Sequence, residues 1–187
     1  MTNIPVQFQD AKDLLTKEGF EVSHIWYHGT SSALLTSILE QGLKRSGDKA
    51  LKQTAKNIMA TIGNSYAETI EPVFLTQSKA LAYYWATEKT REKSIHSEEQ
   101  SEPIVLEVTL NDELNEKVKT DVGAASLLLV SGNNYLEHLS EIYQTCGFVL
   151  PVIDPSSADR LDYLNKMGMA YINQDIDSQF LTVLPAK

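Results

Sequence analysis

The sequence predicts an α+β fold formed by one main domain. The chain has 187 residues, of which 42% are hydrophobic, and this is enough for a single well-formed core. Short β-branched apolar segments are interrupted by segments with helical spacing, and two strand-like segments follow one another at the C-terminal end. This order favours α+β over a repeated βαβ arrangement. We expect residues 1–20 to form an N-terminal helix that packs on a domain spanning residues 21–187.

The first quarter of the chain predicts two helices that flank a strand. Residues 5–19 place apolar side chains on one face, and Gly19 is a typical end for that helix. Residues 21–27 alternate and then become apolar, which is typical of a strand that ends in a loop at His28. Residues 32–41 predict a helix capped by Ser31 or Ser32 and ended by Gly42. Its inward side chains are expected to be Leu34, Leu35, Ile38 and Leu39.

The central segment predicts further helices and the clearest strand. Helical spacing covers residues 48–62, a short apolar strand covers 72–76, and a helix capped by Ser78 covers 77–90. The polar residues 91–102 are expected to form a solvent-exposed loop, followed by a continuous β-branched strand over 103–110.

The last third gives more mixed signals. Helices are expected at residues 123–130, 134–145 and 157–166, with residues 148–154 extended. Two strands, over residues 169–173 and 179–185, are expected to close the chain.

Composition excludes several broad classes of protein. The net charge of −9 argues against a general nucleic-acid-binding protein, which would normally carry a basic face. A single cysteine, Cys146, rules out an intramolecular disulfide and a cysteine-rich zinc site. We find no HExxH, GxGxxG or Walker-type sequence, so neither a metal nor a phosphate-binding loop is expected. The N-terminus lacks the pattern of a signal peptide and no segment is apolar enough to span a membrane, so we expect a cytoplasmic protein or one delivered by a non-classical route.

Three features that lie far apart in the sequence remain as candidates for a site. His28 and Gly29 follow an apolar segment, and a glycine lets a ligand approach the backbone because it has no Cβ. Tyr83, Tyr84 and Trp85 cannot all face the same way in a helix, so one tyrosine is free to stack on a flat ligand. Gln179 opens the last predicted strand and offers both donors and an acceptor.

Together these features resemble the ADP-ribosyltransferase superfamily, in its His-Tyr-Glu/Asp/Gln branch with diphtheria-toxin-like and poly(ADP-ribose) polymerase (PARP)-like enzymes. The resemblance covers roughly residues 22–187. Its first motif is Tyr27-His28-Gly29-Thr30, followed by Ile38 and then Gly42-Leu43 in the next helix. The second is the VFLT segment of residues 73–76 with the Ala80-Leu81-Ala82-Tyr83 sequence after it, and then the PIVLEVTL strand. The third is the segment from Gln179 to Pro185, preceded by the MAYIN strand.

The resemblance implies two small antiparallel sheets packed face to face, with helices outside and an NAD-binding cleft between them. His28 would bind a ribose hydroxyl of the adenosine half, and the backbone of Gly29 would hold the nicotinamide carboxamide, assisted by Thr30. Tyr83 would stack on the nicotinamide ring, with Tyr84 as the alternative if the helix is rotated by one residue. Gln179 would lie beside the nicotinamide ribose. The only cofactor implied is NAD, as co-substrate, with no metal.

The implied activity is NAD-dependent mono-ADP-ribosyl transfer to a protein, nucleic-acid or small-molecule acceptor, with release of nicotinamide. Cleavage of the glycosidic bond builds positive charge on the ribose, which a glutamate would stabilise. Gln179 can accept a hydrogen bond but carries no charge and cannot act as a base. Asp175 or Asp177 is a possible substitute carboxylate. The alternatives are a weak or inactive NAD-binding or ADP-ribose-binding pseudoenzyme and an NAD glycohydrolase, whereas a related RNA 2′-phosphotransferase is disfavoured by the acidic charge.

Overall fold

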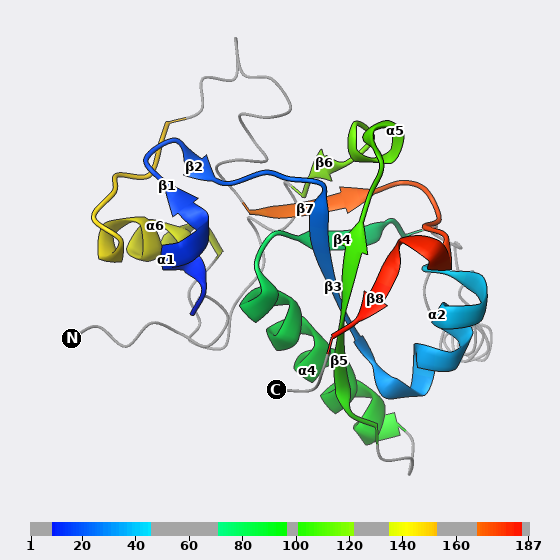
Figure 1. Cartoon of the computed structure of the whole chain (residues 1–187). Coiled ribbons are helices and arrows are strands. Elements are labelled where there is room, and N and C mark those ends of the chain that lie inside the picture. The colour runs from blue at the N-terminus through cyan, green and yellow to red at the C-terminus, as the bar shows by residue number, and fades with distance from the viewer. Residues whose placement is uncertain (1–8, 46–70, 97–100, 122–134, 153–167, 185–187) are drawn as a thin grey trace, which may run out of the picture.

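The computed structural model describes residues 9–45, 71–96, 101–121, 135–152 and 168–184, and these residues form an α+β fold as predicted (Figure 1). The helices expected at 48–62, 123–130 and 157–166 lie outside the described residues.

A six-stranded antiparallel sheet organises the fold, in the order β6-β7-β4-β3-β5-β8. Its strands are β3 (Ile25–Ser31), β4 (Val73–Thr76), β5 (Pro103–Thr109), β6 (Lys119–Thr120), β7 (Met169–Ile172) and β8 (Leu181–Val183). The strands expected at 72–76, 103–110 and 169–173 are confirmed. The first strand begins and ends four residues later than expected, so His28 and Gly29 lie inside a strand rather than in a loop.

The sheet is almost divided into two halves. All seven residues of β3 pair with β5, and all four residues of β4 pair with β7, but β3 and β4 are joined only through Tyr27 and Thr76. Strands β4 and β7 run across the direction of β3 and β5 (Figure 1). The expected pair of separate sheets packed face to face is therefore wrong in this form, because one residue pair links the two halves into a single bent sheet. The separate second sheet is a two-stranded hairpin near the N-terminus.

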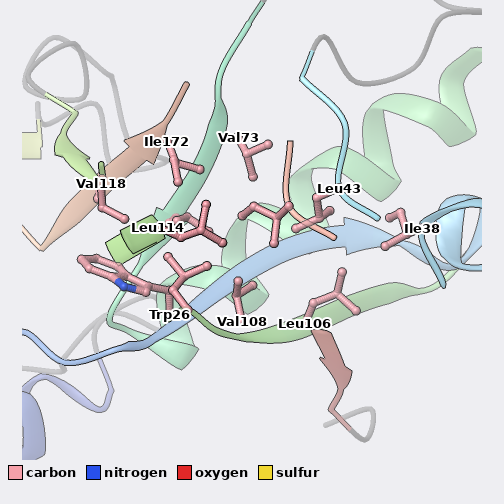
Figure 2. Close-up of a cluster of buried hydrophobic side chains, with 13 residues drawn as sticks. Trp26, Ile38, Leu43, Val73, Leu106, Val108, Leu114, Val118 and Ile172 are labelled. Atoms are coloured by element: carbon pink, nitrogen blue, oxygen red, sulfur yellow. The ribbon is translucent and has the colours of Figure 1, made fainter. Parts of the chain in front are cut away.

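The largest hydrophobic cluster lies in the bend between the two halves (Figure 2). Alternate side chains of the central strands all point into it, because successive side chains of a strand lie on opposite faces. These side chains are Trp26, Val73, Leu75, Leu106, Val108, Ala170 and Ile172. The indole Nε1–H of Trp26 donates to Oδ1 of Asn115 in α5 (Asp112–Asn115) at 2.8 Å, so the largest buried side chain leaves no polar atom unpaired.

Helix α4 (Lys79–His96) covers the opposite face of β3 and β5 and ends six residues later than predicted, within the segment 91–102 that was expected to be a loop. The predicted cap is confirmed, because Oγ of Ser78 accepts the N–H of Leu81 at 3.0 Å. Asp10 adds a second cap: its carboxylate accepts the N–H of Ala80 at 3.0 Å and the hydroxyl of Ser78 at 2.7 Å. These contacts tie the N-terminal segment to the start of α4.

The predicted helix over residues 5–19 is wrong beyond residue 14. The described part consists of α1 (Ala11–Leu14), β1 (Leu15–Thr16) and β2 (Gly19–Phe20), which form a tight hairpin. The hairpin forms because Gly19 adopts a positive φ of 125° and the Thr16 hydroxyl donates to the Gly19 carbonyl at 2.9 Å. It buries Leu15 and Phe20 against α4 and α6 (Tyr135–Thr145). Helix α6 confirms the helix expected at 134–145.

The turn after β3 and the approach to β8 complete the described fold. Ser31 caps η2 (Ser32–Leu34), and α2 (Leu35–Gln41) ends at Gly42, whose φ is 80°, as predicted. Ile38 is buried, but Leu39, expected to point inward, is 46% exposed. The strand predicted at 179–185 is shorter, because residues 178–180 form η4 (Ser178–Phe180) before β8 begins.

Candidate functional site

His28 lies where the two halves of the sheet separate. Its side chain points away from α4, because the next residue, Gly29, faces that helix. Its Nδ1 lies 2.8 Å from the backbone carbonyl oxygen of Phe74 across the gap between β3 and β4. Since a carbonyl only accepts, Nδ1 must carry the proton. The other ring nitrogen, Nε2, is then an acceptor, and it has no partner among the residues that the structure describes.

The His28 ring is neutral at physiological pH. Burial lowers the pKa of His28 to about 3, and the nearby Lys89 ammonium lowers it further, while the hydrogen bond to the Phe74 carbonyl opposes them. A neutral imidazole with its proton on Nδ1 accepts hydrogen bonds through Nε2 and donates none there. The site can therefore receive a hydroxyl group.

Gly29 presents its backbone N–H and C=O toward the gap. The Leu110 N–H donates to the His24 carbonyl at 2.9 Å, so His24 is a residue whose backbone groups bond to the β5 side. In an antiparallel ladder every second residue does this. On β3 the backbone of His28 therefore bonds to β5, and the backbone of Gly29 does not. The peptide groups of Gly29 therefore turn toward β4. The β3–β4 ladder ends at Tyr27, and the Phe74 carbonyl already accepts a hydrogen bond from Nδ1 of His28.

The other side of Gly29 is closed by α4. A Cβ on this residue would collide with the carbonyl oxygen of Ala82 and would lie 2.8 Å from the backbone nitrogen of Ala86. The glycine is thus needed for close packing of helix on strand. The expectation that a ligand approaches over the bare Cα is wrong, because the α4 backbone already fills that space. Only the edge of Gly29, meaning its backbone N–H and C=O on the β4 side, is open to a ligand.

Lys89 reaches this edge from α4. Its Nζ donates to the Gly29 carbonyl at 3.3 Å. Sequence reasoning did not identify this residue. A signal for it exists, because Ala82, Ala86 and Lys89 follow each other at spacings of four and three residues and so lie along one stripe of the helix. Small residues on such a stripe indicate close approach, and a lysine next on it reaches the same strand.

Of the three aromatic residues in α4, only Tyr83 packs beside β3 and β5. It lies against Ala82, Ala86 and Val105, together with Tyr27 and Leu184. Burial raises the pKa of its hydroxyl. Tyr84, the expected alternative, packs instead in the second cluster beside Trp85, with ring centroids 5.2 Å apart. Tyr83 and His28 therefore approach from opposite faces of β3, and the edge of Gly29 lies between them.

Two other residues beside His28 differ in exposure. Thr30, expected to assist binding, is only 2% exposed within β3. Phe74, which sequence reasoning missed, keeps 42% of its surface exposed and faces Tyr171 on β7. The alternation of buried Val73 and Leu75 in VFLT could have identified Phe74 as an outward aromatic ring next to the gap.

The structure does not bring Gln179 to His28. His28 pairs with Leu106, and Leu106 pairs with Val183, so Gln179 lies four residues before the level of His28. This corresponds to about 10 Å along the strands, with two strand spacings of about 4.8 Å in addition. Gln179 is exposed in η4, where its N–H donates to Oδ1 of Asp177 at 3.1 Å. The expected convergence of all three side chains is therefore wrong for Gln179.

Asp175 and Asp177, the expected substitute carboxylates, both lie in the turn before β8, away from His28. Asp175 accepts the Arg45 N–H at 2.9 Å and lies 3.6 Å from the Lys44 ammonium. The Arg45 backbone hydrogen bond, helped by both basic side chains, lowers the pKa of Asp175 against the effect of burial. Asp177 caps η4. Both carboxylates therefore stabilise the approach to β8.

Within the described ranges, no group of three or more His, Cys, Asp or Glu side chains gathers as a metal site would require, and no helix there is long and apolar enough to cross a membrane. Comparison of the chain with family models, curated proteins and solved structures gives no match.

Proposed function

We propose that this chain is an NAD-dependent mono-ADP-ribosyltransferase of the His-Tyr-Glu/Asp/Gln branch, and that it binds NAD along the gap between β3 and β4. The observation that carries the proposal is the pair of adjacent residues at this gap. His28 offers a neutral imidazole acceptor, and Gly29 offers a peptide edge that no strand pairs with.

The binding step follows from these two groups. The Nε2 atom of His28 accepts a ribose hydroxyl from the adenosine half of NAD. The Gly29 N–H and C=O pair with the oxygen and the amide hydrogens of the nicotinamide carboxamide, as a neighbouring strand would. The proposal assigns aromatic stacking on the nicotinamide ring to Tyr83 or Phe74, whose rings lie on the other side of the sheet from the His28 side chain.

The transfer step needs little covalent participation by the protein. The bond between the ribose C1′ and the nicotinamide nitrogen breaks, and neutral nicotinamide leaves with the electron pair. The acceptor attacks C1′ with its own lone pair and loses its proton to a base or to water. Stabilisation of the ribose cation is the main contribution of such a site. No carboxylate among the described residues has been identified for this role, so a slow reaction is expected.

The position of Gln179 favours a second candidate, an NAD-binding or ADP-ribose-binding protein without chemistry. Gln179 is remote from His28 and both aspartates are engaged elsewhere, so the described residues supply groups that bind NAD but no carboxylate beside His28. Release of nicotinamide separates the two candidates, and the ratio of free ADP-ribose to labelled acceptor separates transfer from NAD hydrolysis.

The test uses NAD labelled on the adenine and on the nicotinamide, incubated with the protein and a cell lysate. Wild type is expected to release nicotinamide and label an acceptor, and His28→Ala is expected to lower both by about tenfold, the usual effect of losing one hydrogen bond that holds the substrate. His24→Ala is the matched control, because His24 pairs with Asp112 at 2.9 Å on the surface. Equal rates in His28→Ala and wild type would reject the proposed site. NAD binding without nicotinamide release would select the second candidate.

A further inference from the structure

A row of three side chains lies on the outer face of the part of the sheet formed by β4, β7 and β6. Phe74 is paired with Tyr171, and Tyr171 is paired with Lys119. Paired residues on neighbouring antiparallel strands point to the same face, with Cβ atoms about 5 Å apart. The chain neighbours Val73 and Ile172 are buried in the largest hydrophobic cluster, so the three side chains of the row point away from it.

The row is accessible although it holds two aromatic rings. Phe74 and Lys119 are exposed, and Tyr171 is partly exposed. Among the rings that the structure describes, neither of these two stacks on another. The next pair on the same face, Thr76 and Met169, is buried, so the open area ends there.

Lys119 adds a positive charge beside the rings. Its ammonium forms no ion pair within the described part of the chain, whereas Lys117 pairs with Glu113 at 2.7 Å. Asp121 lies one row further on, about 7 Å along the strand, where its N–H donates to the Met169 carbonyl at 3.0 Å. The net charge of −9 is spread over the chain, and salt screens exposed charges beyond about 8 Å. The row therefore fits a ligand that combines flat rings with negative charge.

We propose that this row binds single-stranded nucleic acid, with bases stacked on Phe74 and Tyr171 and a backbone phosphate held by Lys119. Every base has a π face, so aromatic rings on an open sheet face bind bases without needing a particular sequence. The phosphate accepts a charge-assisted hydrogen bond from the ammonium. Other partners fit less well, because a basic peptide would be repelled by Lys119 and a duplex keeps its bases stacked inside.

This surface goes beyond the proposed function and does not depend on it. One lysine gives weak, local binding rather than the general affinity of a protein with a basic face. The Phe74 carbonyl accepts a hydrogen bond from Nδ1 of His28 at 2.8 Å, so the row begins beside the gap proposed for NAD. Assigning the Phe74 ring to a base leaves Tyr83 for the nicotinamide ring.

The test measures the fluorescence anisotropy of a fluorescein-labelled oligothymidylate of about ten nucleotides, titrated with wild type and variants at low salt. We expect Phe74→Ala and Tyr171→Ala each to weaken binding about tenfold, the usual effect of removing one aromatic ring under a base. Tyr171→Phe retains the ring and should bind within about twofold of wild type. Lys119→Gln should reduce the slope of log affinity against log salt concentration by about 0.7, the value for one phosphate contact on a single strand.

Two controls separate stacking from general charge attraction. Lys17→Gln is the matched control for charge, since Lys17 lies in the turn of the N-terminal hairpin and pairs with Glu18 at 3.2 Å. It should leave the affinity and the salt slope unchanged. A duplex of the labelled strand with its complement should bind more weakly than the single strand, because its bases are not available for stacking.

Equal affinities of wild type, Phe74→Ala and Tyr171→Ala would overturn the inference, as would a duplex that binds as tightly as the single strand. Displacement of the oligonucleotide by saturating NAD would also overturn it, because the Phe74 ring would then belong to the dinucleotide. A wild type that binds NAD but no oligonucleotide refutes this surface and leaves the proposed function standing. Melting temperatures identify any loss of folding, and Lys119→Gln tests the row without removing a ring.

Discussion

Replacing Gly29 by alanine is expected to destabilise the protein by about 3 kcal/mol or more, because the added methyl group has no space. The atoms that it would meet are the carbonyl oxygen of Ala82 and the nitrogen of Ala86, 2.8 Å away for the latter. Both are backbone atoms of α4. Relief therefore requires the whole helix to move away from β3, rather than one side chain to rotate.

Urea unfolding of wild type and Gly29→Ala measures the free energy of unfolding. Gly147→Ala is the control, since a Cβ there meets nothing within 4 Å although φ is 82°. It should cost about 1 kcal/mol, from backbone conformation alone. If Gly29→Ala were no more destabilising than Gly147→Ala, the close contact between α4 and β3 would be incorrect.

Acidification is expected to destabilise the native protein through His28, beginning near pH 6.5. The pKa of His28 is lowered to about 3 in the folded state from its ordinary value of 6.5. Between these values the unfolded chain binds more protons than the native one, so stability falls as pH falls. One such group gives a slope of up to about 1.4 kcal/mol per pH unit, which solvent at the partly exposed ring reduces.

The measurement compares the unfolding free energy of wild type and His28→Asn from pH 5 to pH 7. Asparagine retains an N–H donor for the Phe74 carbonyl but does not titrate. The wild-type curve should fall more steeply toward pH 5 than the variant curve. Parallel curves would mean that His28 is protonated equally in the folded and unfolded states, and would contradict a neutral His28 acceptor at the gap.

Strands and capped helices were predictable because their signals are local. The β-branched segments became β4, β5 and β7, and Ser78 and Gly42 cap helices as their positions indicate. The N-terminal segment was misassigned because the spacing of Phe8, Ala11, Leu14 and Leu15 fits a helix. The chain instead turns at Gly19 to bury Leu15 and Phe20 against distant helices, and tertiary packing decides between such alternatives.

The candidate site was predictable only in part, for a different reason. His28 and Gly29 are adjacent in sequence, so their common position needed no knowledge of the fold. Whether Gln179 joins them depends on the register of β8 against β5, which no local pattern specifies when the strand is short and its start is a 3₁₀ turn. Lys89 depends on the close packing of α4 on Gly29, which is likewise a tertiary contact.

The most direct measurement of the central claim is the nitrogen-15 NMR spectrum of the histidine rings, recorded with and without NAD at neutral pH. We predict that His28 is neutral with its proton on Nδ1, and that saturating NAD shifts its Nε2 resonance while that of His24 stays in place. A charged His28 ring, or an Nε2 resonance of His28 that NAD leaves unmoved, would contradict the proposal that this imidazole receives a ribose hydroxyl.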